Sequence, residues 1–248
     1  VYKALLVGAL ALAAGTGEGL AGSQLPPGIS TGIPTGAPLP EGVYNITWFS
    51  TGTTPNGVDV AYGVPRFLWS TPWSIGGGKI IIDGLVPYVS VAPPGAPSRI
   101  HDWANPFLNT QIKWNLGSGF FGGFESGVYF PTQSDIAKDH ASWQGGAMVG
   151  YLDNGWNLTA ATFYGTGKDG LAGSPQWANV DLTATKKFDK FEVGAIAYGS
   201  TDLSSPYAGY GKQSQFAIGG LVGYDFGPVN AQVKLAHDIA QENYGGYE

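Results

Sequence analysis

The sequence has no cysteine, little charge and no long apolar run. Because its 248 residues include no cysteine, disulfide bonds, thiolate metal ligands and thiol catalysis are excluded. Asp, Glu, Lys and Arg make up only 12% of the residues, against about a quarter in soluble domains. The net charge of −6 and the absence of any basic cluster argue against nucleic acid as a partner.

What the sequence does have is a recurring alternation of polar and apolar side chains over stretches of about ten residues. In residues 228–238, Val229, Ala231, Val233 and Leu235 alternate with Asn230, Gln232, Lys234 and Asp238. Alternation with a period of two places one set of side chains on each face of a β-strand. A tilted strand of roughly 9–11 residues crosses the apolar layer of a membrane. The sequence therefore predicts an all-β fold, a transmembrane antiparallel up-and-down β-barrel.

Short turns and longer loops alternate between these stretches, an asymmetry that outer-membrane barrels share. Eleven strands can be counted, among them one over Lys79–Val91, which a long loop over Ala92–Asn105 follows. Bacterial single-chain barrels have even strand numbers. We therefore expect a barrel of about 12 strands over residues 43–248, with the last, closing strand missing from this chain. The expected short turns are Gly76–Gly78, Gly117–Gly119, Asp153–Gly155, Asp189–Lys190 and Gly227–Pro228.

The N-terminal residues differ from the rest of the chain. Lys3 precedes the apolar run Ala4–Ala14, which is too short for a membrane-spanning helix of about 20 residues, and small residues follow up to Gly22. This order is typical of a secretory signal peptide, so we expect one over residues 1–21; a buried N-terminal helix is the alternative. Residues 22–42 are rich in Pro and Gly and lack apolar periodicity. They are expected to form a lead-in on the periplasmic side or a strap inside the barrel.

Aromatic and charged residues add detail to the barrel hypothesis. Aromatic side chains cluster near strand ends, as they do in the girdles at the two surfaces of a membrane. Charged side chains within strands must face the lumen, because Arg or Lys at the lipid midplane costs about 2–4 kcal/mol. The expected girdle residues are Trp48, Trp69, Trp73, Trp114, Trp143, Trp156, Phe188, Phe191, Tyr224 and Phe226. The expected lumen-lining, solute-contacting residues are Arg66, Asp83, Lys113, Glu125, Asp181, Glu192 and Lys234. Phe121 and Tyr129 are further candidates for stacking on a solute.

Several short motifs carry a family resemblance. Residues Gly127–Thr132 resemble the G-V-Y-x-P-T-G element of the phenol meta-pathway degradation family of outer-membrane proteins, although Gln133 replaces its final glycine. Residues Val222–Gly227 and Lys234–Asp238 resemble the penultimate hairpin of that family, and the similarity runs from about Leu39 to Glu248. The resemblance implies a transporter encoded near genes for aromatic-compound degradation. It does not identify the solute.

We therefore predict a passive outer-membrane channel for small hydrophobic or aromatic compounds, located in the bacterial outer membrane and needing no cofactor. Its expected partners are outer-membrane lipid, the solute and, during biogenesis, the barrel-assembly machinery. One alternative is an outer-membrane barrel enzyme or a structural barrel. The other is a secreted soluble β-sandwich that binds ligands.

Little in the sequence favours catalysis or metal binding. Of the three histidines, His101 and His140 lie in expected loops and His237 ends an expected strand, and no two stand at metal-ligand spacing. The local candidate for a Ser–His–Asp site combines Asp139, His140 and Ser142, and closeness in sequence does not create that geometry. We expect a protein that is not an enzyme, with neither catalytic residues nor a metal.

Overall fold

The computed structural model describes residues 5–6, 23–53, 58–92, 98–171 and 173–243. It confirms the all-β prediction, because these residues form a single sheet whose strands are antiparallel apart from one short pair. No described helix is long and apolar enough to span a membrane. The strands are β1 (Leu5–Leu6), β2 (Gly42–Thr53), β3 (Asp59–Ile75), β4 (Gly78–Leu85), β5 (Tyr88–Ala92), β6 (Ile100–Trp103), β7 (Phe107–Gly117), β8 (Phe120–Tyr129), β9 (Ser142–Asp153), β10 (Trp156–Gly165), β11 (Trp177–Phe188), β12 (Phe191–Asp202), β13 (Ser214–Asp225) and β14 (Asn230–Glu242).

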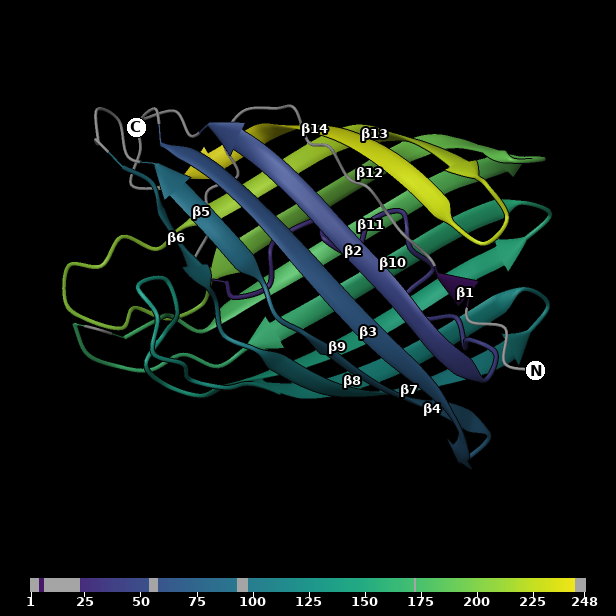
Figure 1. The fold of residues 1–248 in the computed structure, drawn as a ribbon, viewed down its shortest axis with the longest axis horizontal. Coiled ribbons are helices and arrows are strands. Elements are labelled where there is room, and N and C mark those ends of the chain that lie inside the picture. Colours follow the sequence, from purple (N-terminus) through teal and green to yellow (C-terminus); the bar gives the residue numbers. More distant parts are fainter. Residues whose placement is uncertain (1–4, 7–22, 54–57, 93–97, 172, 244–248) are drawn as a thin grey trace.

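Eleven long strands follow one another around the sheet in the order β2-β3-β4-β7-β8-β9-β10-β11-β12-β13-β14, and the sheet rolls up around an interior (Figure 1). Tight turns join the strands at one end, which we call the turn end. Longer connections lie at the other end, which we call the loop end. Asn154 and Gly155 both have positive φ, 48° and 78°, as a two-residue hairpin turn requires, so the Asn-Gly pair fixes the β9–β10 register.

The rolled sheet is not closed by hydrogen bonds between its two edges in the described part of the chain. Beyond β3, β2 pairs only with β1, in parallel, and β14 pairs only with β13. The first and eleventh of eleven alternating strands run in the same direction, so β2 and β14 cannot pair with each other antiparallel. A closing twelfth strand stays a prediction.

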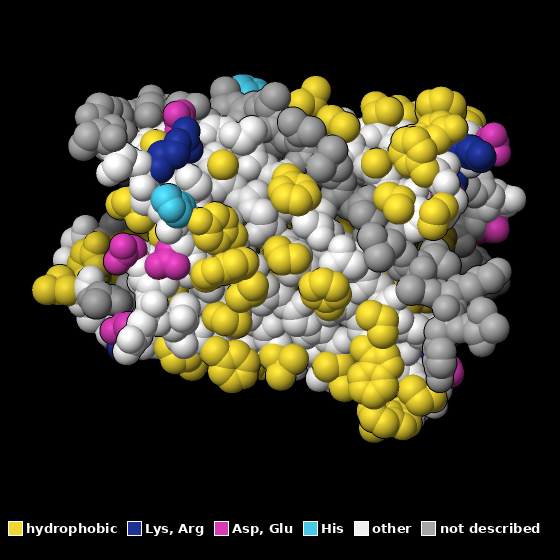
Figure 2. Space-filling model, in the orientation of Figure 1, with side chains coloured by type: hydrophobic (Ala, Val, Ile, Leu, Met, Phe, Trp, Pro, Cys, Tyr) yellow, Lys and Arg dark blue, Asp and Glu magenta, His cyan; other side chains and the backbone are white. Residues whose placement is uncertain are grey.

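Side chains alternate between the interior and the exterior along nearly every strand. In β7, Asn109, Gln111 and Lys113 are buried, whereas Leu108 and Leu116 are 54% and 63% exposed. The exterior is the apolar face: large hydrophobic side chains are exposed all around the sheet, and on the face in Figure 2 the charged side chains gather toward the two ends. This is the reverse of a soluble protein, whose apolar side chains lie inside.

Residues 23–39 run through the interior, and we call them the inner strap. At the loop end, Asn179 donates a hydrogen bond to the carbonyl oxygen of Leu25 over 3.0 Å. At the turn end, Ser70 donates one to the carbonyl oxygen of Leu39 over 2.8 Å, just before β2 begins. The strap therefore runs the length of the lumen from the loop end to the turn end (purple in Figure 1).

Three expectations about single elements were wrong. The strand expected over Lys79–Val91 breaks at residues 86–87 into β4 and β5, because Pro87 lacks a backbone donor for the ladder. Part of the loop expected over Ala92–Asn105 forms β6, which pairs with β5. Trp48 is not a girdle residue but lies inside, 3% exposed, on the same face of β2 as Tyr44. The signal peptide expected over residues 1–21 lies outside the described residues except for β1.

Candidate functional site

All seven charged residues predicted to line the lumen have buried or half-buried side chains on the interior face of the sheet. The structure divides them into two groups. One group belongs to β3, β4, β7 and β8; the other belongs to β11, β12 and β14, and part of it binds the inner strap. The first group is Arg66, Asp83, Lys113 and Glu125, and the second is Asp181, Glu192 and Lys234.

Arg66, Asp83 and Glu125 of the first group form an ion-pair network within the wall, which we call the wall cluster. The Nε atom of Arg66 lies 2.6 Å from Oδ1 of Asp83, and its Nη2 atom lies 3.9 Å from Oε2 of Glu125. Asn109 donates to both carboxylates, over 3.1 Å to Asp83 and 3.2 Å to Glu125. Buried charges need such pairing and hydrogen bonding, because an unpaired charge in a dry interior costs several kcal/mol.

Neutral amides complete the wall cluster. Gln111 donates to Oδ2 of Asp83, and Gln144 donates to Oε1 of Glu125 over 2.8 Å. Tyr129 in turn donates to Oε1 of Gln144 over 2.8 Å. All four carboxylate oxygens of the cluster therefore already accept a hydrogen bond or an ion pair. These amides were not among the site residues expected from the sequence. The alternation could have identified them, because Asn109 and Gln111 in β7 and Gln144 in β9 stand at inward-facing positions.

Lys113 lies beside the wall cluster but differs from it. Its side chain is only 5% exposed, yet within the described chain it makes no hydrogen bond and no ion pair within 4.0 Å. It lines a cavity of about 250 Å³ between the wall and the inner strap. The other lining residues are mainly apolar and aromatic, and they include Leu25, Ile29, Tyr44, Trp48, Leu68, Phe107 and Phe163.

The second group holds the inner strap. The Asp181 carboxylate accepts hydrogen bonds from the backbone amides of Gly28 and Ser30, both over 2.9 Å, and from the Ser30 hydroxyl over 2.6 Å. Lys234 donates to the carbonyl oxygen of Thr31. Turns within the strap pair only some of its backbone polar groups, and these wall side chains supply partners for others.

The strap is held on one side by polar contacts and on the other by apolar packing. Leu25 and Ile29 pack in the buried cluster that contains Trp48, Val64 and Phe107. The wall opposite is polar. Thr183 accepts a hydrogen bond from the backbone amide of Gly32. Asn157 and Gln232 donate to the carbonyl oxygen of Gly32. Glu192 belongs to this side and accepts a hydrogen bond from Gln232 over 3.0 Å, so it reaches the strap only through that residue.

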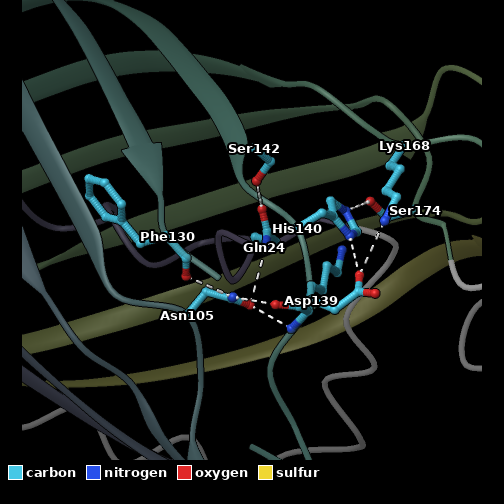
Figure 3. A network of polar contacts seen from close by, with 9 residues as sticks. Gln24, Asn105, Phe130, Asp139, His140, Ser142, Lys168 and Ser174 are labelled. Carbon is cyan, nitrogen blue, oxygen red and sulfur yellow. Dashed lines mark hydrogen bonds and ion pairs between the residues drawn. The ribbon is translucent and has the colours of Figure 1, made fainter. Parts of the chain in front are cut away.

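A second polar network lies at the loop end (Figure 3). Ser142 does not contact His140, as a Ser–His–Asp site with Asp139 would require, but donates to Gln24 of the strap. His140 instead lies 3.1 Å from the Ser174 hydroxyl through Nε2 and 3.0 Å from Asp139 through Nδ1. The hydrogen bond to His140 and the charge of Lys168 lower the pKa of Asp139.

This serine–histidine–aspartate contact has the order of a catalytic triad, but the backbone amide of its serine is not free. The backbone amide of Ser174 is bonded to the carbonyl oxygen of Lys168 over 2.9 Å, so it cannot serve an oxyanion. The Ser174 side chain is also buried, at 5% exposed for the residue. The contacts instead join the loop between β8 and β9 to the loop between β10 and β11. Among the described residues, no group of three or more His, Asp or Glu side chains is placed to hold a metal ion.

Comparison with known protein families separates the barrel strands from the inner strap. A family model described as "putative MetA-pathway of phenol degradation" matches residues 40–248, which begins where the inner strap ends. No curated protein and no solved structure gave a significant match. Because the family model covers most of the sequence, the chain belongs to the family described as "putative MetA-pathway of phenol degradation".

Proposed function

We propose that the protein is a bacterial outer-membrane channel that admits small hydrophobic or aromatic compounds by passive diffusion through its lumen. The observation that carries the proposal is the inverted distribution of side chains: an apolar exterior surrounds an interior of charged, amide and aromatic residues. An apolar exterior of this extent is stable only where lipid or another apolar surface covers it. The membership in a family named for phenol degradation makes aromatic compounds the leading solutes.

The two ends of the sheet give the proposed orientation. In outer-membrane barrels short turns face the periplasm and longer loops face the exterior, so the loop end would be outermost. Trp156 and Phe191 at the turn end and Trp143 at the loop end are 43%, 60% and 40% exposed on the outside. Such aromatic side chains suit the two membrane surfaces. Lipid, solute and, during biogenesis, the barrel-assembly machinery would be the partners of the chain.

The inner strap and the cavity beside it define the path. Because the strap runs the length of the lumen, a solute must pass beside it or move it aside. The cavity of about 250 Å³ lies on this path, and a cavity of roughly 150 Å³ is already large enough for benzene. Binding and release at this cavity would be the step that selects solutes. We propose no catalytic role, because Ser174 is buried and its backbone amide is already bonded to the carbonyl oxygen of Lys168.

Reconstitution into planar bilayers and liposomes tests the proposal. We expect discrete conductance steps and entry of small aromatic solutes into protein-containing liposomes, well above the rate into empty ones. Heat-denatured protein added to the same liposomes is the control for leakage. A folded, membrane-inserted protein that gives neither conductance nor solute entry would exclude the channel.

A further inference from the structure

The cavity beside the wall cluster has hydrogen-bond donors without partners. The indole Nε1 of Trp48 is buried and has no hydrogen-bond partner in the described structure, and neither has the hydroxyl of Thr35. Both residues line the cavity together with Lys113, whose ammonium group has no hydrogen bond either. Buried donors nearly always have partners, and leaving one unpaired costs about 1–3 kcal/mol. Two such groups and an ammonium group without a hydrogen bond to any described residue, all around one cavity, therefore point to a ligand.

The carboxylate acceptors next to this cavity are already used. Asp83 accepts from Arg66, Asn109 and Gln111, and Glu125 accepts from Asn109 and Gln144. A ligand that brings a donor would compete for these occupied oxygens. A ligand that brings only acceptors would satisfy the donors that are free. The indole N–H and the ammonium group can only donate, so the chemistry of the cavity is complementary to an acceptor-only group.

The rest of the cavity wall suits an apolar ring. Tyr44, Phe107 and Phe163 line it together with Leu25, Ile29 and Leu85, and its polar part is formed by Lys113 with Arg66, Gln111, Glu125, Gln144 and Asn230. Aromatic pairs gain about 0.5–1.5 kcal/mol beyond burial when they stack with an offset or meet edge to face. We propose that this cavity is a binding site for a one-ring aromatic carboxylate, with its ring among the aromatic side chains and its carboxylate on Trp48 and Lys113. The proposal rests on the proposed function and narrows its solute class from aromatic compounds to aromatic anions.

Neutral analogues of the same size provide the comparison. Benzoate presents only acceptors at neutral pH, benzyl alcohol keeps the ring but replaces the carboxylate by a donor-bearing hydroxyl, and toluene has no polar group. Charge-assisted hydrogen bonds are about twice as strong as neutral ones. We therefore expect detergent-solubilised wild-type protein to bind benzoate at least about tenfold more tightly than benzyl alcohol, and toluene most weakly, by calorimetric titration.

Two substitutions test the assigned donors. Trp48→Phe removes the indole N–H and keeps an aromatic ring, and Lys113→Met removes the ammonium group and keeps the aliphatic chain. Each should weaken benzoate binding by about tenfold and leave toluene binding within about twofold. Trp156→Phe, on the outer face, is the matched control and should bind benzoate like the wild type. Heat-modifiable migration on gels shows whether each variant is folded.

The outcomes separate the two proposals. Equal affinities for benzoate and benzyl alcohol in the wild type would overturn the anion site, and so would unchanged benzoate binding by folded Trp48→Phe and Lys113→Met proteins. Should liposome assays still show solute entry in that case, the channel stands and only the anion site fails. Selective benzoate binding without any conductance or solute entry would instead support the site and exclude the channel.

Discussion

The contact between Asp181 and the inner strap gives the sharpest prediction. Replacing Asp181 with Ala removes the carboxylate that accepts three hydrogen bonds from Gly28 and Ser30. We expect the strap of the Asp181→Ala protein to leave the lumen far more often than that of the wild type. Ser30 and Gly28 would then lose these hydrogen bonds to the wall, while Lys234 and Thr183 would still hold the neighbouring residues.

The magnitude follows from the two backbone amides. When the strap is in place, each would be buried without an acceptor, at a cost of about 1–3 kcal/mol. Even about 1.5 kcal/mol for each gives roughly 3 kcal/mol against the seated strap. At 1.4 kcal/mol per factor of ten, the population with the strap displaced should rise about a hundredfold. Water or a small shift of the strap would recover part of this, so tenfold is a reasonable lower bound.

A thiol reporter measures the displacement. The sequence contains no cysteine, so Ile33→Cys in the strap would be the single reactive thiol. Its rate of reaction with a membrane-impermeant thiol reagent, in protein reconstituted into liposomes, reports how often the strap is accessible. We expect the rate to rise at least tenfold when Asp181→Ala is added, together with longer or larger openings in planar bilayers.

Asp225→Ala is the matched control. Asp225 also carries a carboxylate on this side of the sheet, but it pairs with Lys187 at the turn end over 2.5 Å and contacts no strap residue. The Ile33 thiol should react equally fast with and without this substitution. The reasoning is refuted if Asp181→Ala, folded as judged by heat-modifiable migration, leaves the reaction rate within twofold of its parent.

Three further predictions concern the exterior, the loops and pH. Val233→Lys places a charge on the outer face of β14 and should destabilise the protein by about 2–4 kcal/mol in urea titrations in lipid vesicles. Ser174→Ala removes the contact with His140, so proteolysis between residues 166 and 176 should become faster, while hydrolysis of aromatic esters stays at background. The contact with Lys187 lowers the pKa of Asp225, so the folded state gains stability above the ordinary carboxyl pKa and loses it as the pH falls through the lowered value. Comparing acid unfolding of the wild type and Asp225→Asn checks this sign, and the difference should be small because the pair is partly exposed to solvent.

The strands and their facing were predictable because they depend on a local pattern. Asn109, Gln111 and Lys113 alternate with mainly apolar neighbours. In a membrane-spanning strand, only one choice of inward and outward faces keeps the charge of Lys113 out of the lipid. The tight turns were predictable for the same reason, since Asn154 and Gly155 form one of the residue pairs that two-residue hairpin turns favour.

Trp48 shows where a local pattern is insufficient. Its position near the end of an expected strand is typical of a girdle. The interior face of β2, however, carries apolar side chains, so the expectation that interior side chains are polar does not hold for this strand. Trp48 is interior because it packs in one cluster with Leu25 and Ile29 of the strap, and Tyr44 is interior in a second cluster against which Leu39 of the strap packs. The face of β2 therefore depends on a segment outside the sheet.

The strap itself depends on contacts that no short pattern encodes. Asp181 is more than 150 positions away from Gly28 and Ser30, and the groups it binds are backbone amides, which every residue except proline has. The sequence does predict that Asp181 faces the interior, and burial then requires that its carboxylate find donors. It does not say whether those donors come from neighbouring strands, as they do for Asp83, or from a strap. The difference matters for function, because donors on neighbouring strands brace the wall, whereas donors on a strap make the same carboxylate a restraint on the path through the lumen.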